Sequence, residues 1–155
     1  MSAVENKLIE LGHALPEVVP PVAVYVPAVR SGNYVYTSGQ LPMVNGELPR
    51  AGKVGGGEVD ADTAKELAAR CALNGLAAIK SVIGNLDDIV RVVKVVGFVA
   101  SDPTFTGQPQ VINGASELLG EALGDKGVHA RSAVGVAVLP LDSPVEIDIV
   151  VEVKG

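Results

Sequence analysis

The sequence predicts an α+β fold in which helices cover one face of a β-sheet. The first observation is the order of segments along the 155 residues: β-hairpin, helix, strand, helix and a second β-hairpin. The second is composition, because 48% of the residues are hydrophobic and only 3% are aromatic, as expected for a core of Val, Ala and Leu. A sheet covered on one side leaves its other face apolar, and this predicts an oligomer.

The first 21 residues are expected to form a helix and a proline-rich arm, followed by a single domain at residues 22–155. Val4, Leu8 and Leu11 have helical spacing, and Gly12 follows them as a stop signal. The next segment, ALPEVVPP, contains three prolines and therefore predicts an extended connection.

The first β-hairpin is predicted from β-branched and aromatic residues at 22–29 and 34–38, joined by a Ser-Gly-Asn turn. Asn45-Gly46 is a second strong turn signal. The glycines at 55–57 are interpreted as a flexible connection, since the Lys-Ser/Thr of a phosphate-binding loop does not follow them.

Two helices and one strand make up the central part of the sequence. Asp60 or Asp62 is suited to cap a helix that runs to about Ile83, and Cys71 lies in the apolar stripe of that helix as a core residue. A second helix is predicted at 109–123. Residues 89–100 are almost all apolar, which favours a strand buried on both faces.

The last two strands, 130–139 and 145–153, are predicted to form a terminal hairpin. Arg131 and Glu146 lie in these strands among Val, Ala and Ile. From spacing alone, the favoured interpretation is a cross-strand salt bridge between them on a solvated face. The alternative is a functional pair, because charges in apolar surroundings need a partner or a task.

Composition excludes several classes of function. A net charge of −6 disfavours nucleic-acid partners, since such a surface repels phosphates. One cysteine and two histidines give no disulfide framework and little material for a metal site. No segment approaches the roughly 18 consecutive apolar residues of a membrane span. We therefore expect a cytoplasmic protein without a metal, membrane or nucleic-acid partner.

Three stretches of the sequence match the motifs of a known family. They are ARSAVGVAVLP at 130–140 leading into VEI, Tyr25 followed by GNYVYTSGQLP at 32–42, and IVRVVKVVGFV at 89–99 followed by Asn113. Over roughly residues 22–153 the chain resembles the reactive-intermediate deaminase family, also called RidA or YjgF. The resemblance implies a chorismate-mutase-like α+β sheet with two helices on one face, assembled as a homotrimer with clefts between subunits.

The resemblance also implies an activity and a set of site residues. The expected activity is hydrolytic deamination of small 2-enamine or 2-imino acids, such as 2-aminoacrylate, without a metal or organic cofactor. Arg131 would bind the substrate carboxylate and Glu146 would position the hydrolytic water. The residues implied to line the same cleft are Tyr25, Ser38, Gly39 and Asn113.

These residue types suit that chemistry. A guanidinium fork matches a planar carboxylate, and a half-buried carboxyl group is able to exchange protons with water and departing ammonia. The sequence departs from the family at Ala133, where many members have cysteine, and at Val128-His129, where an aromatic-Pro pair is usual. For His129 a place at the rim of the cleft is the alternative, and the favoured interpretation is a solvent-facing residue at the start of a strand.

The departures leave a second class of function open. The chain could be a non-catalytic protein that binds a small carboxylate metabolite and regulates another process. A third interpretation, an endoribonuclease or translation inhibitor, is disfavoured by the acidic charge and the few aromatics.

Overall fold

The computed structural model describes residues 1–18 and 23–155. Val22, the expected start of the first strand, and the end of the proline-rich arm lie outside the described residues. The elements in chain order are α1 (Ala3–Glu10), β1 (Ala28–Ser31), β2 (Tyr34–Thr37), α2 (Ala61–Ile83), η1 (Leu86–Asp88), β3 (Ile89–Ala100), α3 (Gln108–Leu123), η2 (Gly124–Gly127), β4 (Ala130–Val136), η3 (Pro140–Asp142) and β5 (Val145–Val153).

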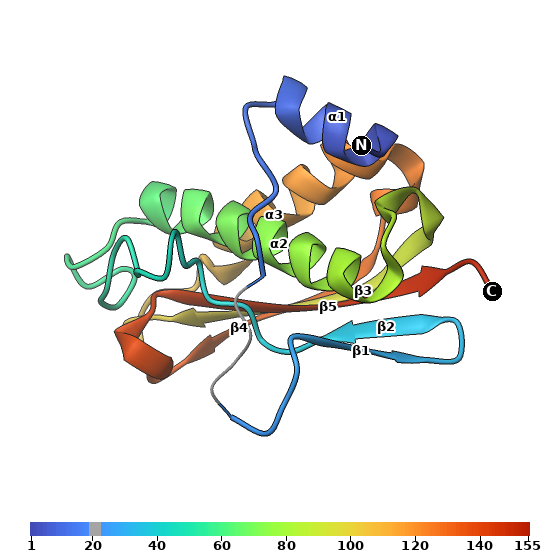
Figure 1. The fold of residues 1–155 in the computed structure, drawn as a ribbon. Coiled ribbons are helices and arrows are strands. Elements are labelled where there is room, and N and C mark those ends of the chain that lie inside the picture. The colour runs from blue at the N-terminus through green and yellow to red at the C-terminus, as the bar shows by residue number, and fades with distance from the viewer. Residues whose placement is uncertain (19–22) are drawn as a thin grey trace.

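The strands form a five-stranded sheet in the order β1-β2-β5-β3-β4. β3 runs antiparallel to β5 and parallel to β4. The predicted terminal hairpin is therefore wrong, because β3 lies between β4 and β5 (Figure 1). Residues 137–144 carry the chain past β3 rather than turning it back onto β4. The proline-rich segment between the two strands was a turn signal, and such a signal does not determine which strands pair.

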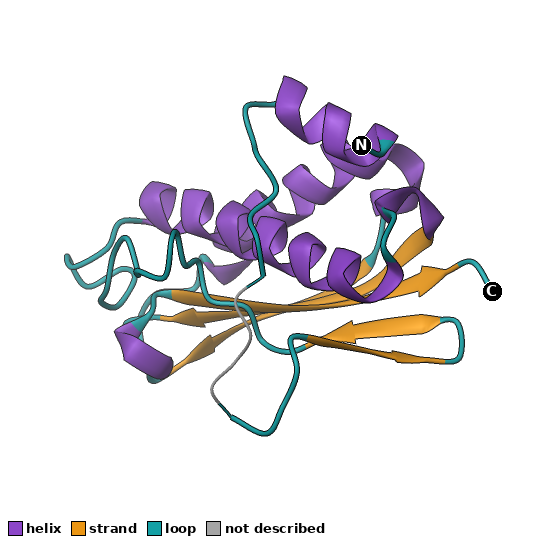
Figure 2. Ribbon diagram, viewed as in Figure 1, coloured by secondary structure: helices purple, strands orange, loops and turns teal. Residues whose placement is uncertain are grey.

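Both long helices and α1 lie on the same side of the sheet, and no α-helix of residues 1–18 and 23–155 covers its other face (Figure 2). Burial alternates along β5 accordingly: Ile147 is fully buried, whereas its neighbours Glu146 and Asp148 are half-buried. In β3, Val95 is buried and Val96 is half-buried. The expectation that 89–100 is buried on both faces is thus wrong for the single chain. We call this uncovered side of the sheet the open face. The α+β class, with two helices on one face, is confirmed.

Close packing of the two long helices depends on glycine. The α2 N-terminus is capped as predicted, with the Asp60 carboxylate accepting a hydrogen bond from the Thr63 N–H at 2.7 Å. A Cβ on Gly114 of α3 would lie 1.9 Å from the Lys65 carbonyl oxygen of α2. A Cβ on Gly97 of β3 would lie 2.5 Å from Ile112. The glycines therefore let α3 lie directly against both α2 and the sheet.

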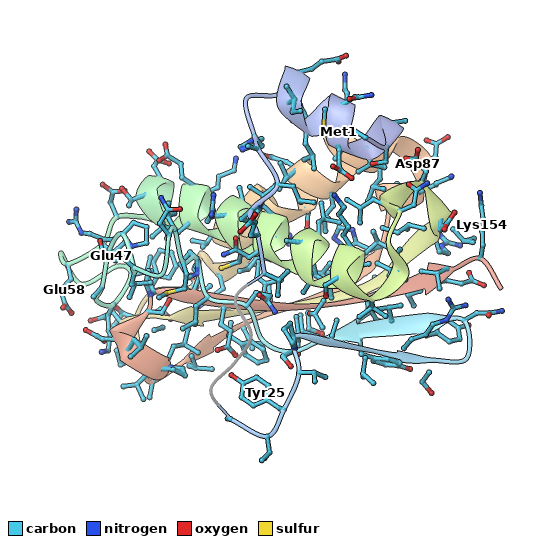
Figure 3. All side chains as sticks on the ribbon, viewed as in Figure 1. Met1, Tyr25, Glu47, Glu58, Asp87 and Lys154 are labelled. Atoms are coloured by element: carbon cyan, nitrogen blue, oxygen red, sulfur yellow. The ribbon has the colours of Figure 1, made fainter. Side chains whose placement is uncertain are left out.

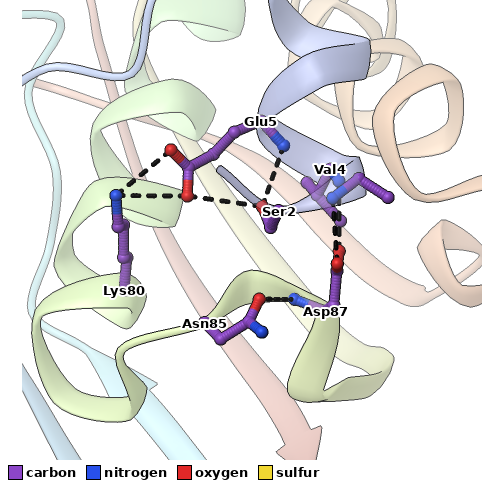
Figure 4. Close-up of polar contacts among 7 residues, drawn as sticks. Ser2, Val4, Glu5, Lys80, Asn85 and Asp87 are labelled. Carbon is purple, nitrogen blue, oxygen red and sulfur yellow. Dashed lines mark hydrogen bonds and ion pairs between the residues drawn. The ribbon is translucent and has the colours of Figure 1, made fainter.

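The N-terminal helix is attached to this core by the polar contacts that Figure 4 shows and also by buried apolar side chains. The backbone N–H groups of Ala3 and Val4 donate to the Asp87 carboxylate at 2.9 and 3.1 Å. Lys80 of α2 pairs with Glu5 at 3.1 Å. Leu8 is fully buried in the same cluster as the side chains between helices and sheet. The helix predicted from Val4, Leu8 and Leu11 is thus present and packed.

Cys71 is fully buried, as predicted, and burial raises the pKa of its thiol well above the usual value, which makes it unreactive. Among the described residues, every helix is too short or too polar to cross a bilayer.

Candidate functional site

Arg131 is held at the β4 edge of the sheet, on the side of the helices. It pairs with Val95, which is buried beneath the helices. Its Nη1 donates to Asn113 Oδ1 at 2.8 Å and to Ser116 Oγ at 3.2 Å. Asn113 and Ser116 lie one turn apart on α3, so they present their side chains on the same side of that helix.

The partners of Arg131 are neutral, and this decides what the side chain is able to do. Within the described part of the chain no carboxylate pairs with the guanidinium. Its Nη1 hydrogens are both used, whereas no hydrogen bond in that part of the chain involves Nε or Nη2. Those two nitrogens form the edge that binds a carboxylate through two parallel hydrogen bonds. Arg131 is therefore a half-buried cation that is fixed in place but not neutralised.

His129 belongs to the same group of side chains. Its Nε2 lies 2.9 Å from Ser116 Oγ, and its Nδ1 lies 2.6 Å from the Gly127 carbonyl oxygen. The interpretation of His129 as a solvent-facing residue is wrong. Residues 129 and 131 are two apart in an extended segment and so project to the same side, toward α3.

A second group of the expected site residues lies on the open face. Glu146 of β5 pairs with Phe98 of β3 on this side of the sheet. Gly39 lies against its carboxylate, since a Cβ at position 39 would be 2.7 Å from Glu146 Oε2. Gln40 bridges to Ile147 through two backbone hydrogen bonds of 2.7 and 3.0 Å, which fixes the segment beside Glu146.

Ser38 links this group to the loop that contains Tyr25. The Ser38 hydroxyl donates to the Val26 carbonyl at 2.6 Å, and the Ser38 N–H donates to the Pro27 carbonyl at 2.8 Å. Figure 3 shows Tyr25 on the side of the sheet away from the helices. Its side chain is 59% exposed, so a single chain does not enclose it.

Glu146 is in an environment that favours its protonated form. Burial is the larger cause and the nearby Asp148 carboxylate the smaller one, and together they raise the pKa of Glu146. Burial likewise raises the pKa of Asp148, whose Oδ1 is buried without a hydrogen-bond partner among the described residues. Two carboxyl groups therefore lie on the open face with a shared preference for retaining a proton.

The two groups of side chains lie on opposite faces of the sheet. Arg131 pairs with Val95 and Glu146 with Phe98, and residues three apart on one strand point to opposite sides. The expected cross-strand salt bridge between Arg131 and Glu146 is therefore wrong. The structure brings Arg131 and Asn113 together, and separately Ser38, Gly39 and Glu146.

A hollow of about 350 Å³ borders His129, Arg91 and Glu152 but includes neither Arg131 nor Glu146. Among the residues described, no three His, Cys, Asp or Glu side chains gather in a group able to hold a metal ion.

Sequence reasoning missed Ser116, His129 and Asp148. A helical wheel places Ser116 beside Asn113, and strand alternation places His129 beside Arg131 and Asp148 beside Glu146. Each of these three residues follows by helical or strand spacing from a residue of the family motifs, so the sequence did contain a signal for them.

Comparisons with known proteins place this geometry in context. The family model described as Endoribonuclease L-PSP matches residues 16–153. The chain is 40% identical to Protein TCP17 of Trypanosoma cruzi over 152 residues, covering 97% of this chain and 94% of that one. Among solved structures, protein Atu1372 of Agrobacterium tumefaciens, described as of unknown function, is 48% identical with a TM-score of 0.92, covering 98% and 93% of the two chains. E. coli TdcF, solved with bound serine, is 26% identical with a TM-score of 0.59, covering 90% and 93%.

Proposed function

Because the chain belongs to the Endoribonuclease L-PSP family, also called the RidA/YjgF family, we propose that it hydrolyses small 2-enamine and 2-imino acids of the 2-aminoacrylate type. The observation that supports this most directly is the state of Arg131. Its guanidinium is positioned by the neutral oxygens of Asn113 and Ser116, and its Nε and Nη2 remain for a ligand. A half-buried cation with two adjacent donors suits a planar carboxylate.

The TdcF structure adds support for the class of ligand. In serine the carboxylate and the amino group are attached to the same carbon, which is the arrangement of these groups in a 2-amino acid and, with a C=N bond, in a 2-imino acid. That protein was solved with serine bound and has the fold of this chain. A small amino-acid-like carboxylate is therefore the ligand class we assign to this site.

In the proposed reaction, Arg131 binds the carboxylate and keeps the imine carbon in a fixed position. Glu146 holds a water molecule and accepts one of its protons as the oxygen adds to that carbon. That proton passes to the imine nitrogen and gives a carbinolamine. The proton of its new hydroxyl group then moves through Glu146 to the nitrogen as the C=O bond forms and the C–N bond breaks, and the products are a 2-oxo acid and ammonia. The raised pKa of Glu146 suits this exchange, because burial and the nearby Asp148 make the carboxylate a stronger base than an ordinary glutamate. Positioning supplies much of the acceleration, since the imine is already electrophilic.

The proposed site is formed between subunits of a homotrimer. A single chain presents Arg131 on the side of the helices and Glu146 on the open face, so one chain does not bring both to the same substrate. The open face also carries apolar side chains such as Tyr34, Tyr36 and Val134, which are 43%, 44% and 44% exposed. Contact between the open face of one subunit and the β4 edge of the next would cover these side chains and complete the site.

The test generates 2-aminoacrylate in situ and measures how much imine semicarbazide traps. Wild-type protein should decrease trapping, and Arg131→Ala should lose about 10- to 100-fold of this activity, the size of a charged hydrogen bond. Arg131→Lys should recover little, because an ammonium lacks the fork. Lys7→Ala, a surface cation on α1, is the matched control. Trapping that is unchanged by wild-type protein, or equally decreased by Arg131→Ala, contradicts the proposal.

Ala133 supports a second candidate function, a regulatory protein that binds a carboxylate without turnover. Ala133 of β4 pairs with Gly97 of β3 and places a methyl group where many relatives have a thiol. A ligand that raises the melting temperature without forming a 2-oxo acid would favour this function over deamination.

A further inference from the structure

The His129 ring is hydrogen-bonded at both nitrogens, and this determines where its proton lies. A backbone carbonyl only accepts, so the contact of 2.6 Å between Nδ1 and Gly127 O requires a proton on Nδ1. In the neutral ring Nε2 is then an acceptor, and it receives the Ser116 hydroxyl proton at 2.9 Å. With its proton committed to His129, the Ser116 oxygen presents lone pairs to Arg131 Nη1 at 3.2 Å.

The chain of hydrogen bonds therefore runs in one direction, from Arg131 through Ser116 and His129 to the Gly127 carbonyl. Its final acceptor is fixed by packing. Gly127 is buried, and a Cβ there would lie 2.3 Å from the Leu119 carbonyl oxygen of α3. The short turn η2 thus lies directly against α3. This packing holds the Gly127 carbonyl in a fixed position, where it accepts the hydrogen bond from the His129 ring.

We propose that His129 and Ser116 are positioning residues for Arg131. The histidine orients the Ser116 hydroxyl, and the serine oxygen together with Asn113 Oδ1 occupies both hydrogens of Nη1. That restraint fixes the plane of the guanidinium and presents Nε and Nη2 to the carboxylate. The inference rests on the proposed function for the identity of the ligand, but the hydrogen-bond chain itself does not depend on it.

The first measurement concerns the ring alone. The chain has two histidines, and His13→Gln leaves His129 as the single imidazole. Nitrogen-15 NMR of this full-length variant should show the tautomer protonated at Nδ1, and adding Ser116→Ala should weaken that preference. A ring protonated at Nε2, or a tautomer unaffected by loss of the serine, overturns the proposed chain.

The second measurement concerns ligand binding, with pyruvate as the probe because it is the 2-oxo acid product of 2-aminoacrylate hydrolysis. Ser116→Ala and His129→Leu should each weaken pyruvate binding about five- to tenfold, the effect of one hydrogen bond. The double variant should be no weaker than either single variant, because both changes break the same chain. His129→Gln, which retains an acceptor for Ser116, should restore most of the affinity. Ser81→Ala on α2 is the matched control and should bind like wild type.

The kinetic readout distinguishes positioning from a general loss of structure. Both single variants should raise KM for the imino acid and leave kcat within about twofold, because they act on carboxylate binding rather than on the water at Glu146. Additive losses in the double variant, no rescue by His129→Gln, or equal affinity in Ser116→Ala and wild type overturn the positioning role. If wild-type protein binds no pyruvate, the proposed function is wrong. The tautomer measurement still tests the series of hydrogen bonds from Arg131 to the Gly127 carbonyl.

Discussion

Arg131 and Glu146 lie on opposite faces of one sheet. The residues of β3 with which they pair, Val95 and Phe98, are three positions apart. Neither finds a charged partner of opposite sign within the described part of the chain. Each is instead placed by neutral groups: Arg131 by Asn113 and Ser116, and Glu146 by the close approach of Gly39. The chain therefore carries two separate half-sites, and the proposed chemistry depends on how copies of the chain meet.

A charge on the open face should prevent assembly. Val134 of β4 is 44% exposed beside Phe98, and an aspartate there would be buried without a partner on association. Light scattering should give a trimer for wild type and a single chain for Val134→Asp, with loss of deaminase activity. Val82→Asp on α2, at 37% exposure, should remain trimeric. A wild-type protein that is monomeric at all concentrations contradicts the proposed assembly.

The carboxyl group of Asp148 should weaken the fold as pH rises. Burial raises its pKa in the folded protein, so the folded chain binds more protons than the unfolded chain between the two pKa values. The associated stability is fully present below the unfolded pKa and is lost as pH rises through the folded pKa. Asp148→Asn should match wild type at low pH and exceed it at neutral pH, by at most about 1 kcal/mol because solvent screens a half-buried charge. Denaturant unfolding across pH, at one protein concentration, measures the difference.

Two glycines of α3 should respond in opposite ways to the same substitution. A Cβ on Gly114 meets the Lys65 carbonyl oxygen at 1.9 Å, whereas a Cβ on Gly120 meets no atom of the described residues within 4 Å. Gly114→Ala should destabilise by about 3 kcal/mol, as an overpacked contact does. Gly120→Ala should stabilise by about 0.5–1 kcal/mol, since alanine is the better helix former. Calorimetric melting of both variants tests the α2–α3 contact, and equal effects would contradict it.

The N-terminal helix should detach in acid before the rest of the fold. Hydrogen bonds from the Ala3 and Val4 N–H groups lower the pKa of Asp87. The stability that these hydrogen bonds contribute is present above the pKa of Asp87 in the unfolded chain. It is lost as pH falls through the lower pKa of the folded chain. Hydrogen exchange over α1 should accelerate at acidic pH in wild type, and Asp87→Asn should show faster exchange already at neutral pH. Unchanged exchange in the variant would show that Leu8 and the Glu5–Lys80 pair hold α1 by themselves.

Local sequence signals predicted the elements well where one physical rule dominates. The Asp60 cap, the apolar stripe of α2 and the Asn45-Gly46 turn, with φ of 51° and 80°, all follow from short-range rules. The end of α3 was also confirmed, at Leu123, whereas the first strand of the hairpin is shorter than predicted and begins at Ala28.

Non-local pairing was not predictable in the same way. The segments 130–136 and 145–153 are neighbours in sequence, yet β3 lies between them, because parallel pairing of β3 with β4 depends on contacts that no local pattern encodes. The apolar run at 89–100 correctly predicted a strand. It wrongly predicted burial on both faces, since about half of the side chains of this strand face the open side. The His129 contact was missed because it requires the turn at Gly127 to lie against α3.

Because the two half-sites lie on different faces, a substitution that destroys one of them leaves the other intact on the same chain. A protein carrying Arg131→Ala keeps an intact open face, and one carrying Glu146→Gln keeps an intact β4 edge. When the two inactive proteins are dissociated and reassembled together, some subunit interfaces combine the intact open face of one variant with the intact β4 edge of the other. Such hybrids should recover activity that neither parent has, a form of intragenic complementation.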